Sequence, residues 1–285
     1  MLCYRYFKFD DAKESLNDGW YKTSKPSEFN DPFDCRANFV GEPSDRVLGE
    51  YIDRNFKWIR ELAIQTNPIW ASVSIDRNFV LAKLRASINW AKDATRTMRE
   101  GADAIVRIMC FSRAAVENEV ADNLMWAHYA DKGTGVRIGF DFNDANNHRA
   151  YHLEAVHYDS AMPTIDLSKV NQWPIDNSEV SKFFAKCLCA KDSSWKYEDE
   201  VRMIIPRTAP KIAPMFQERL VKGVKMDFVH FSYAAIRSVD FGVRADIDQC
   251  KKLMAAIRGK EDARHISFRR AEYRDDIYGY KFVEL

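Results

Sequence analysis

The order of strand-like and helix-like segments along the chain is the feature that most limits its fold. Alternating or β-branched apolar runs predict strands, and apolar positions spaced three and four residues apart predict helices. In several places one predicted strand follows another without the helical crossover that parallel neighbours require. The sequence therefore predicts an α+β protein with mostly antiparallel mixed sheets and flanking helices, and not a doubly wound parallel sheet.

The predicted elements cover the whole chain. Strands are predicted at residues 2–9, 20–24, 104–112, 135–141, 151–158, 201–205, 225–231, 235–242, 264–273 and 278–284. Helices are predicted from a capping box at Asp11 and Glu14 to Gly19, and at residues 44–66, 76–99, 117–130, 177–191 and 246–258. The two helices after residue 44 predict a helical insert at about residues 44–101. We expect residues 1–285 to form a single domain.

Composition excludes several classes of protein. The chain has 285 residues, of which 46% are hydrophobic, and its 43 basic and 42 acidic residues give no overall attraction to nucleic acid or membranes. The longest uncharged run, residues 62–75, is too short and too polar to span a bilayer. Because charged residues interrupt the N-terminal segment, we expect a cytoplasmic protein without a secretory signal. The spacing of the six cysteines predicts buried free thiols, and no metal site.

The segment FNDPFDC at residues 29–35 combines turn-forming and aromatic residues. Asn30, Asp31 and Pro32 favour a turn in which polar side chains bond the backbone, while Phe29 and Phe33 would anchor it to the core. A rigid structural turn is the ordinary interpretation. The functional alternative makes Asn30, Asp31 or Asp34 a polar ligand on a fixed loop.

The segment WKYEDEVR at residues 195–202 carries the most suggestive pair of acids. If the extended backbone begins near residue 197, Glu198 and Glu200 share one face of the strand, and their proximity should raise at least one pKa. A solvated edge strand in which Arg202 pairs with one carboxylate is the ordinary alternative. Trp195 and Tyr197 favour a site, because they can form an apolar wall.

A third segment, residues 125–140, places Trp126 and Tyr129 three residues apart on a predicted helix, with His128 on an adjoining face. A structural role is the ordinary interpretation of His128. It has no second His or carboxylate at helical spacing for metal binding, and acid/base chemistry is the alternative if the fold places it in a cleft. The glycines at 133 and 135 lead into a strand, which indicates a turn and not a phosphate-binding loop.

Two further features concern positive charge. Arg5 lies between Tyr4 and Tyr6 on a predicted interior strand, where a guanidinium needs a carboxylate or phosphate partner, and Glu200 is one candidate. Residues 251–274 carry eight basic and three acidic residues. A solvated face is the ordinary interpretation of this stretch, and contact with nucleic acid is the alternative.

These segments, in this order, resemble a widespread bacterial family known only as a domain of unknown function. The resemblance runs through Y-R-Y at residues 4–6, F-N-D-P-F-D, C-F-S at residues 110–112, M-W-x-H-Y-A-D and W-x-x-E-x-E-V-R, and it ends at residues 236–242. It covers nearly the whole chain, and the helical insert is the variable part. This resemblance implies no function.

The chain also resembles, more loosely, the ADP-ribosyltransferase superfamily, whose Arg, Ser and Glu motifs follow one another on three core strands. Arg5, Ser112 and Glu200 occur in that order, and Glu198 with Glu200 resembles the E-x-E of these enzymes. The resemblance implies that Glu200 and Glu198 are catalytic, that Arg5 grips the phosphates or ribose of NAD, and that Ser112 orients the centre. The chain departs from the pattern in having a single Ser and a large insert after Arg5.

We therefore expect an ADP-ribosyltransferase-like protein that transfers ADP-ribose from NAD to a protein or nucleic-acid acceptor, or hydrolyses NAD, in the setting of a toxin or phage-defence effector. The residues expected to bind NAD are Arg5, Tyr6, Tyr21, Asn30, Asp31, Ser112, Trp126, His128 and Tyr129. One alternative is a phosphodiesterase that binds Mg²⁺ through Asp31, Asp34, Glu198 and Glu200. Another is a non-catalytic module that docks a partner on FNDPFDC and the Trp126/Tyr129 face.

Overall fold

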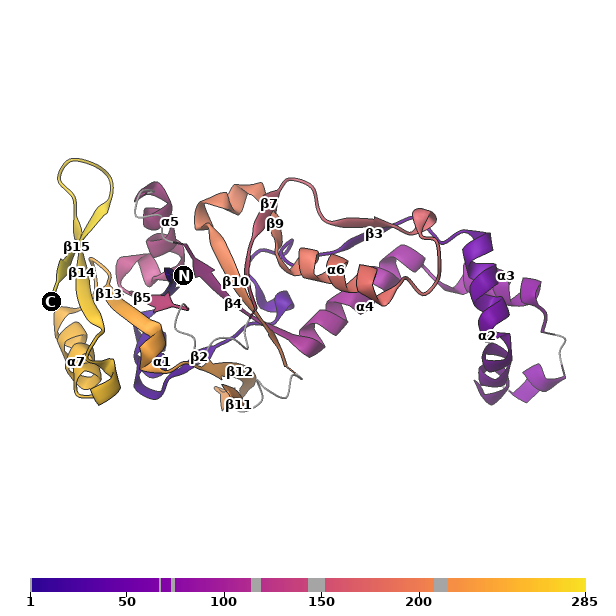
Figure 1. Ribbon diagram of the computed structural model, residues 1–285, viewed down its shortest axis with the longest axis horizontal. Helices are drawn as coiled ribbons and strands as arrows, with labels where there is room; N and C mark the ends of the chain where they lie inside the picture. Colours follow the sequence, from indigo (N-terminus) through magenta and orange to yellow (C-terminus); the bar gives the residue numbers. More distant parts are fainter. Residues whose placement is uncertain (1, 67, 73–74, 114–118, 143–151, 208–214) are drawn as a thin grey trace.

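A computed structural model describes residues 2–66, 68–72, 75–113, 119–142, 152–207 and 215–285. Its centre is an eight-stranded sheet with the order β15-β14-β13-β5-β1-β4-β10-β6 (Figure 1). In sequence order these strands are β1 (Leu2–Phe7), β4 (Val106–Ser112), β5 (Val136–Asp141), β6 (His152–Ala155), β10 (Glu200–Pro206), β13 (Ile236–Phe241), β14 (Ser267–Tyr273) and β15 (Tyr280–Glu284). Only β13 and β14 pair in parallel; the other neighbours are antiparallel. The predicted α+β class with mostly antiparallel mixed sheets is confirmed.

Three smaller sheets surround the central one. They consist of β11 (Phe216–Val221), β12 (Val224–His230) and β2 (Trp20–Lys22), of the parallel pair β3 (Asn38–Val40) and β8 (Thr164–Asp166), and of the parallel pair β7 (His157–Asp159) and β9 (Ala190–Asp192). Strands β3, β8, β9 and β11 were not predicted. The first three have only three residues each and depend on partners far away in the sequence, so no local periodicity reveals them.

The main core lies on one face of the central sheet. Helices α1 (Phe9–Asp18) and α7 (Ile247–Arg258) bury Leu16 and Leu253 in a cluster with Ile138, Phe140 and Phe241. At the end of the molecule where both termini lie, Figure 1 shows α1 and α7 at the bottom and α5 (Glu119–Tyr129) at the top. The helices therefore cover the antiparallel strands on both faces, as an α+β layer arrangement requires.

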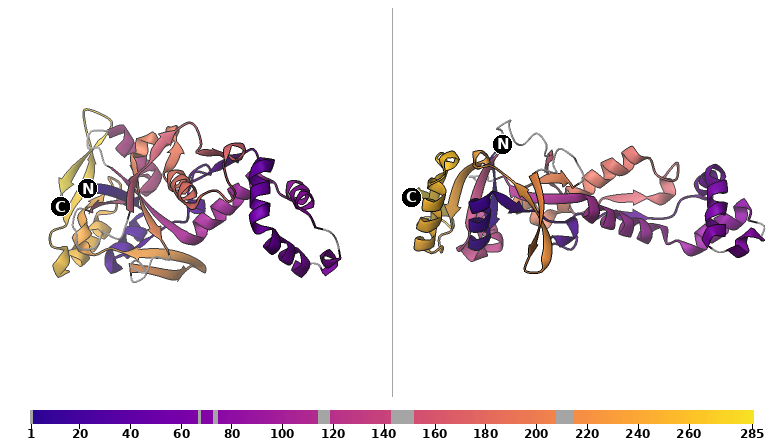
Figure 2. Two further views of the ribbon diagram at one scale, coloured as in Figure 1. Left: turned by 45° about the vertical axis from the view of Figure 1, so that its right-hand side comes forward. Right: turned by 90° about the horizontal axis from the view of Figure 1, so that it is seen from below.

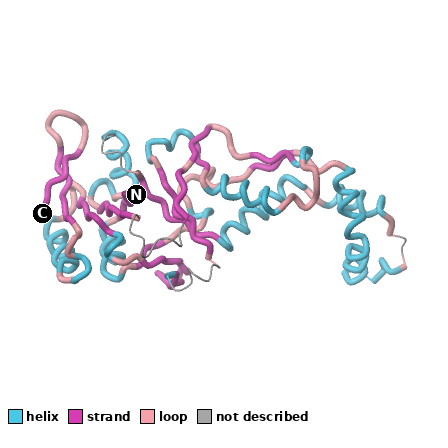
Figure 3. Tube along the Cα trace, in the orientation of Figure 1, coloured by secondary structure: helices cyan, strands magenta, loops and turns pink. Residues whose placement is uncertain are grey.

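The helical insert extends away from the sheets as an arm (Figures 1 and 2). It contains α2 (Asp45–Thr66), α3 (Arg77–Ser87) and α4 (Trp90–Ile105), and α4 returns to the sheet beside α6 (Asn177–Leu188). Figure 3 shows that the far end of this arm is almost entirely helical. Within the described residues, no helix is long and apolar enough to cross a membrane.

The single helix predicted at residues 76–99 is wrong, because α3 and α4 are separate. The chain is extended at Ile88, and the Asn89 side chain accepts a hydrogen bond of 3.2 Å from the backbone N–H of Lys92, so it caps α4. Gly101 lies inside α4, and the strand predicted from residue 104 therefore begins only at Val106.

Other predicted boundaries also shift. Helix α1 begins at Phe9 after Lys8, which provides no side-chain cap, so the predicted capping box at Asp11 is wrong. Gly19 ends the helix as predicted, with a left-handed φ of 77° and its N–H bonded to the Ser15 carbonyl. The strand predicted at residues 151–158 is divided into β6 and β7, and α6 ends at residue 188. Residues 117, 118 and 151 lie outside the described residues.

Candidate functional site

A cavity of about 230 Å³ lies where two strands of the central sheet separate. Strand β1 pairs with β5 at six positions, but its register with β4 contains only Tyr4 opposite Ser112. Arg5 lines the cavity from β1, and Cys110 and Ser112 line it from β4. Strand β10 continues the sheet beyond β4 and places Glu200 directly opposite Ser112. The sheet order thus brings residues about 100 positions apart in the sequence to one cavity.

Two carboxylates at this cavity converge on one buried ammonium group. The Lys191 Nζ atom lies 2.5 Å from Glu198 Oε2 and 3.1 Å from Glu200 Oε2. All three side chains are 4% exposed. The Tyr129 hydroxyl donates a hydrogen bond of 2.5 Å to the other oxygen of Glu198, and the amide of Asn30 donates to that hydroxyl at 3.3 Å. The predicted convergence of Glu198 and Glu200 is therefore present.

A buried guanidinium holds the second carboxylate from behind. Arg202 Nε lies 2.8 Å from Glu200 Oε1, and Arg202 Nη2 lies 2.7 Å from Asp34 Oδ2. Arg202 Nη1 donates to the Leu188 carbonyl at 2.6 Å, and the guanidinium lies over the ring of Phe29. Three carboxylates, those of Asp34, Glu198 and Glu200, thus share two buried cations, Lys191 and Arg202.

The different surroundings of Glu198 and Glu200 shift the pKa values of the two glutamates in opposite directions. Burial raises the pKa of Glu198, and the charge of Lys191 together with the Tyr129 hydrogen bond only partly opposes this effect. Burial also acts on Glu200, but the closer pairing with Arg202 and the charge of Lys191 outweigh it and lower its pKa to about 2. Glu200 therefore stays ionised at neutral pH, whereas Glu198 is the group suited to exchanging a proton.

Arg5 does not form the predicted ion pair with Glu200. The Arg5 guanidinium lies 5.1 Å from the ring of Phe7, and its buried Nη1 atom has no hydrogen-bond partner among the described residues. Burial lowers the pKa of Arg5, yet an arginine keeps its proton at neutral pH. A cation without a carboxylate partner consequently lines the same cavity as the two glutamates.

A tight turn positions the two glutamates. Residues Ser193–Glu198 form a short 3-10 helix, Asp199 adopts a left-handed φ of 41°, and β10 begins only at Glu200. The hydroxyl of Ser112 donates to the Glu198 carbonyl at 2.7 Å, and the N–H of Glu200 donates to the Tyr158 hydroxyl at 2.8 Å. The predicted reason for their convergence, a shared strand face, is therefore wrong, because a turn separates them.

Seven of the eleven predicted site residues line the cavity, and four do not: Tyr21, Asp31, Trp126 and His128. Tyr21 is fully buried in the main core, where its ring contacts Phe140. Asp31 is buried in its turn and accepts a hydrogen bond of 2.8 Å from the Phe33 N–H. Phe33 itself is 61% exposed, so it does not anchor this turn to the core as predicted.

The other two residues lie near the cavity without lining it. Trp126 is 1% exposed because Tyr6 and Phe282 pack against it, so it is not available to the predicted docking face, whereas Tyr129 is half-buried. His128 is exposed, with its ring 6.3 Å from that of Tyr197. Its position gives it no contact with the two glutamates among the interactions of the described residues.

Sequence reasoning missed Lys191 and the burial of Arg202, whereas the pairing of Arg202 with one of the two glutamates is present. Lys191 follows the mainly apolar run CLCA at residues 187–190, and a charged residue directly after such a run is a signal that it is buried and paired. Arg202 was considered only as a solvated partner, but its side chain is 0% exposed. Neither position carries a local pattern that shows which carboxylate it meets.

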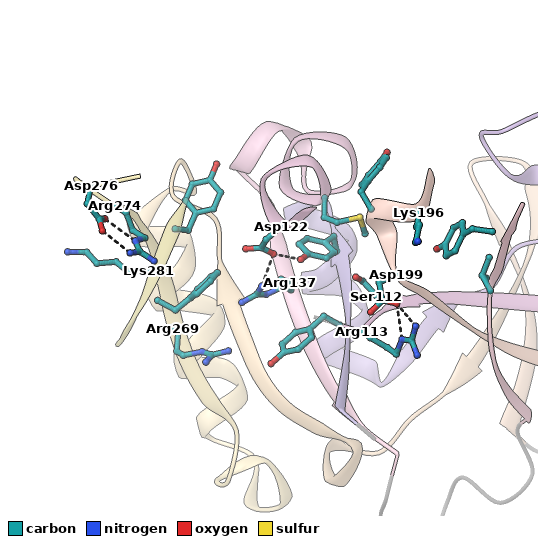
Figure 4. A pocket seen from close by; sticks show the side chains of 18 of the residues that line it. Ser112, Arg113, Asp122, Arg137, Lys196, Asp199, Arg269, Arg274, Asp276 and Lys281 are labelled. Carbon is teal, nitrogen blue, oxygen red and sulfur yellow. Dashed lines mark hydrogen bonds and ion pairs between the residues drawn. The ribbon is translucent and has the colours of Figure 1, made fainter. Parts of the chain in front are cut away.

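A second, larger cavity of about 960 Å³ adjoins the first and shares Tyr4, Tyr6, Ser112 and Met125 with it. Figure 4 shows this outer cavity, with Arg274 and Lys281 of the β14–β15 hairpin on one side and Lys196 and Arg113 on the other. Asp122 and Arg137 lie between these two sides. The two cavities therefore have part of their walls in common; the smaller is lined by three carboxylates and two cations, and the larger by six cations and four aspartates.

The four carboxylates of the Mg²⁺ alternative do not come together. Asp31 lines a different pocket, while Asp34, Glu198 and Glu200 point to Lys191 and Arg202. Among the described residues, no group of three or more His, Cys, Asp or Glu side chains has the arrangement of a metal site. The six cysteines are all free. The carboxylate oxygens of Asp34, Glu198 and Glu200 are thus paired with Lys191 and Arg202.

Comparison with known proteins identifies one part of the chain. Residues 125–203 match the model of a family described as Protein of unknown function (DUF2971). No curated protein and no solved structure matches the chain. The matched region includes Tyr129, Lys191, Glu198, Glu200 and Arg202, so it contains the acidic half of the site but neither Arg5 nor Ser112. The resemblance is thereby found over a shorter region than the sequence motifs predicted.

Proposed function

We propose that this protein cleaves the N-glycosidic bond of NAD, releasing nicotinamide and passing the ADP-ribosyl group to water or to an acceptor. The observation that carries this proposal is a pair of glutamates in one cavity whose environments shift their pKa values in opposite directions. Such a pair divides the work between a permanently ionised carboxylate and one that exchanges protons, as glycoside-cleaving sites require.

The permanently ionised carboxylate suits the bond-breaking step. When the bond between the ribose C1′ and nicotinamide breaks, the electron pair leaves with nicotinamide and the ribose becomes an oxocarbenium-like cation. Glu200 keeps its negative charge because Arg202 and Lys191 hold it in place. A fixed buried carboxylate stabilises such a cation without reorganising during the reaction.

Glu198 suits the second step. An attacking hydroxyl or water forms the new bond to C1′ and must lose a proton, which Glu198 accepts as a carboxylate. Its raised pKa makes it a stronger base than an ordinary glutamate, and Tyr129 fixes one of its oxygens. Arg5, whose Nη1 atom has no hydrogen-bond partner among the described residues, offers a charge for a phosphate oxygen of the donor.

The sizes of the two cavities support a dinucleotide substrate. The inner cavity of about 230 Å³ is smaller than the roughly 300–1,000 Å³ of a site for a drug-sized ligand, so it holds only part of such a molecule. The outer cavity of about 960 Å³ accommodates the remainder. A nicotinamide riboside end in the inner cavity would bring C1′ to Glu198 and Glu200.

The test is nicotinamide release from NAD by the purified protein and by the variants Glu198→Gln, Glu200→Gln and Arg5→Lys. We expect each variant to lower the rate by at least about tenfold, since each removes a charge or geometry used in the reaction. Glu284→Gln changes an exposed glutamate on the same sheet and should keep the wild-type rate. Circular dichroism and thermal unfolding must show that the variants compared are folded.

Two results would contradict the proposal. One is nicotinamide release that persists at the wild-type rate in folded Glu198→Gln and Glu200→Gln proteins. The other is the absence of NAD binding by calorimetry together with the absence of release, because a competent site with a missing acceptor should still bind its donor. Release of nicotinamide with free ADP-ribose as the product would identify hydrolysis, and a modified macromolecule would identify transfer.

A further inference from the structure

The outer cavity has a composition that the cleavage of NAD does not explain. Six basic residues and four aspartates line it, and aromatic side chains form much of the remaining wall. Its basic residues are Arg113, Arg137, Lys196, Arg269, Arg274 and Lys281. Cations mixed with aromatic rings are typical of sites in which bases stack and phosphates are paired.

Two of the six basic residues, Arg137 and Arg269, form ion pairs with aspartates inside the protein. Arg137 and Arg269 both contact Asp240, at 2.9 Å and 2.7 Å, and Arg137 also lies 2.9 Å from Asp122. The Asp240 side chain is 0% exposed. These groups are neutralised by buried carboxylates, so they do not supply the charge that a ligand would meet.

The cations at the rim are differently placed. Arg274 pairs with Asp276 at 2.9 Å and Lys281 with Glu272 at 3.4 Å, and in both pairs each side chain is at least 32% exposed. Exposed ion pairs of this kind contribute little, about 0–1 kcal/mol, so a phosphate can replace the carboxylate at small cost. Lys196 on the opposite side is exposed and has no ion pair among the described residues.

The tip of the β14–β15 hairpin adds exposed aromatic surface beside these cations. Tyr278 is 96% exposed and Tyr273 is 62% exposed, on either side of Arg274 and Asp276. The carbonyl of Tyr278 accepts a hydrogen bond of 2.9 Å from the Asn123 side chain, which ties the tip to α5. The backbone at the tip is therefore held to α5, and the ring of Tyr278 is open to solvent in the hairpin that also carries Arg274 and Lys281.

We propose that the outer cavity and the hairpin tip bind single-stranded nucleic acid. Bases stack on Tyr278 and on the aromatic wall, and phosphates pair with Arg274, Lys281 and Lys196. A duplex does not fit this site, because its bases are already stacked and unavailable to the tyrosines. Binding in itself does not depend on NAD; the further role of the strand as the ADP-ribosyl acceptor rests on the proposed function.

The test measures fluorescence anisotropy of fluorescein-labelled single-stranded DNA and RNA of one sequence, without NAD, at several salt concentrations. We expect saturable binding at low salt. The logarithm of the association constant should fall with the logarithm of the salt concentration at a slope of about −2, because three phosphate contacts on a single strand give about −0.7 each. The corresponding duplex should bind several-fold more weakly. If only the DNA or only the RNA oligonucleotide binds, the result identifies which nucleic acid the site prefers.

Variants locate the binding on the molecule. Tyr278→Ala should weaken binding by about fivefold or more, and Arg274→Ala should weaken it and reduce the salt slope by about 0.7. Arg46→Ala and Trp58→Ala are controls on α2, where Arg46 forms an exposed ion pair with Glu50 and Trp58 is 56% exposed. These controls should bind as the wild type does.

The proposal is overturned if no saturable binding occurs, if the duplex binds as tightly as the single strand, or if the α2 controls weaken binding as much as the hairpin variants do. It is also overturned if an acidic peptide of equal charge competes as well as unlabelled oligonucleotide, since charge alone would then account for binding. Nicotinamide release without oligonucleotide binding refutes this inference and leaves the proposed function standing. Oligonucleotide binding by a protein that neither binds NAD nor releases nicotinamide supports this inference and refutes the proposed function.

Discussion

Replacing Glu200 by Gln should destabilise this protein far more than replacing Glu198 by Gln, although the two residues share the same lysine. Glu200 contacts Arg202 at 2.8 Å and Lys191 at 3.1 Å, and loss of its charge leaves two buried cations with one carboxylate fewer. Glu198 is already disfavoured as an ion in the folded protein, because burial raises its pKa. Neutral Gln at residue 198 can still accept from Lys191 with its single oxygen, and its amide group can donate to the Tyr129 hydroxyl.

The magnitude follows from the pKa of Glu200. Its value falls from 4.5 to about 2 on folding, and each pKa unit is worth about 1.4 kcal/mol, which gives about 3 kcal/mol of stability at neutral pH. Removing one partner of a buried ion pair costs a similar amount, about 3–5 kcal/mol. For Glu198→Gln we expect a cost of about 1 kcal/mol or less, the size of a weakened hydrogen bond.

The assay is urea unfolding at pH 7, monitored by circular dichroism and tryptophan fluorescence. At roughly 2–4 °C per kcal/mol, Glu200→Gln should also lower the melting temperature by about 6–12 °C. The exposed variant Glu284→Gln serves as the control for a glutamate-to-glutamine change on the same sheet. A loss for Glu198→Gln equal to or greater than that for Glu200→Gln would refute the charge arrangement described for this site.

Three further predictions follow from particular residues. Because the folded-state pKa of Glu200 is lowered, its stabilising contribution is complete above about pH 4.5 and disappears as the pH falls toward 2; acid titration of unfolding should show a shallower loss in Glu200→Gln than in the wild type. Tyr129→Phe removes a hydrogen bond that lowers the pKa of Glu198, so the acidic limb of the pH–rate profile for nicotinamide release should move to higher pH, and an unmoved limb would argue against Glu198 as the base. Gly19→Ala should cost about 1–2 kcal/mol in urea unfolding, because residue 19 has a φ of 77° and a Cβ there would lie 2.7 Å from the His230 ring, whereas Gly101→Ala, with open space around its Cα, should not destabilise α4.

Parts of the candidate site were predictable because their signals are local. The acids at 198 and 200 stand two residues apart beside an apolar strand, and the turn at residues 29–35 has ordinary turn chemistry. Arg5 attracted attention because a charge between aromatic residues on a strand is unusual. The aromatic residues Tyr21 and Trp126 were misassigned, since an aromatic residue that fills a core and one that lines a cavity have the same local pattern.

The sequence by itself determined the class of the fold, the position of the helical insert and the end of α1 at Gly19, because periodicity and backbone freedom are properties of neighbouring residues. It did not reveal the break at Ile88, which depends on capping, or the three-residue strands, which depend on distant partners.

Only the tertiary structure decided which charges meet. The sheet order places β1, β4 and β10 side by side, so that Glu200 lies opposite Ser112 and Arg5 lines the same cavity. Lys191 reaches the glutamates from β9, a strand that the local pattern does not connect to them, whereas Arg202 lies two residues after Glu200 on β10. The energy of a buried charge depends on partners brought close by long-range strand pairing, and that pairing is a property of the whole chain.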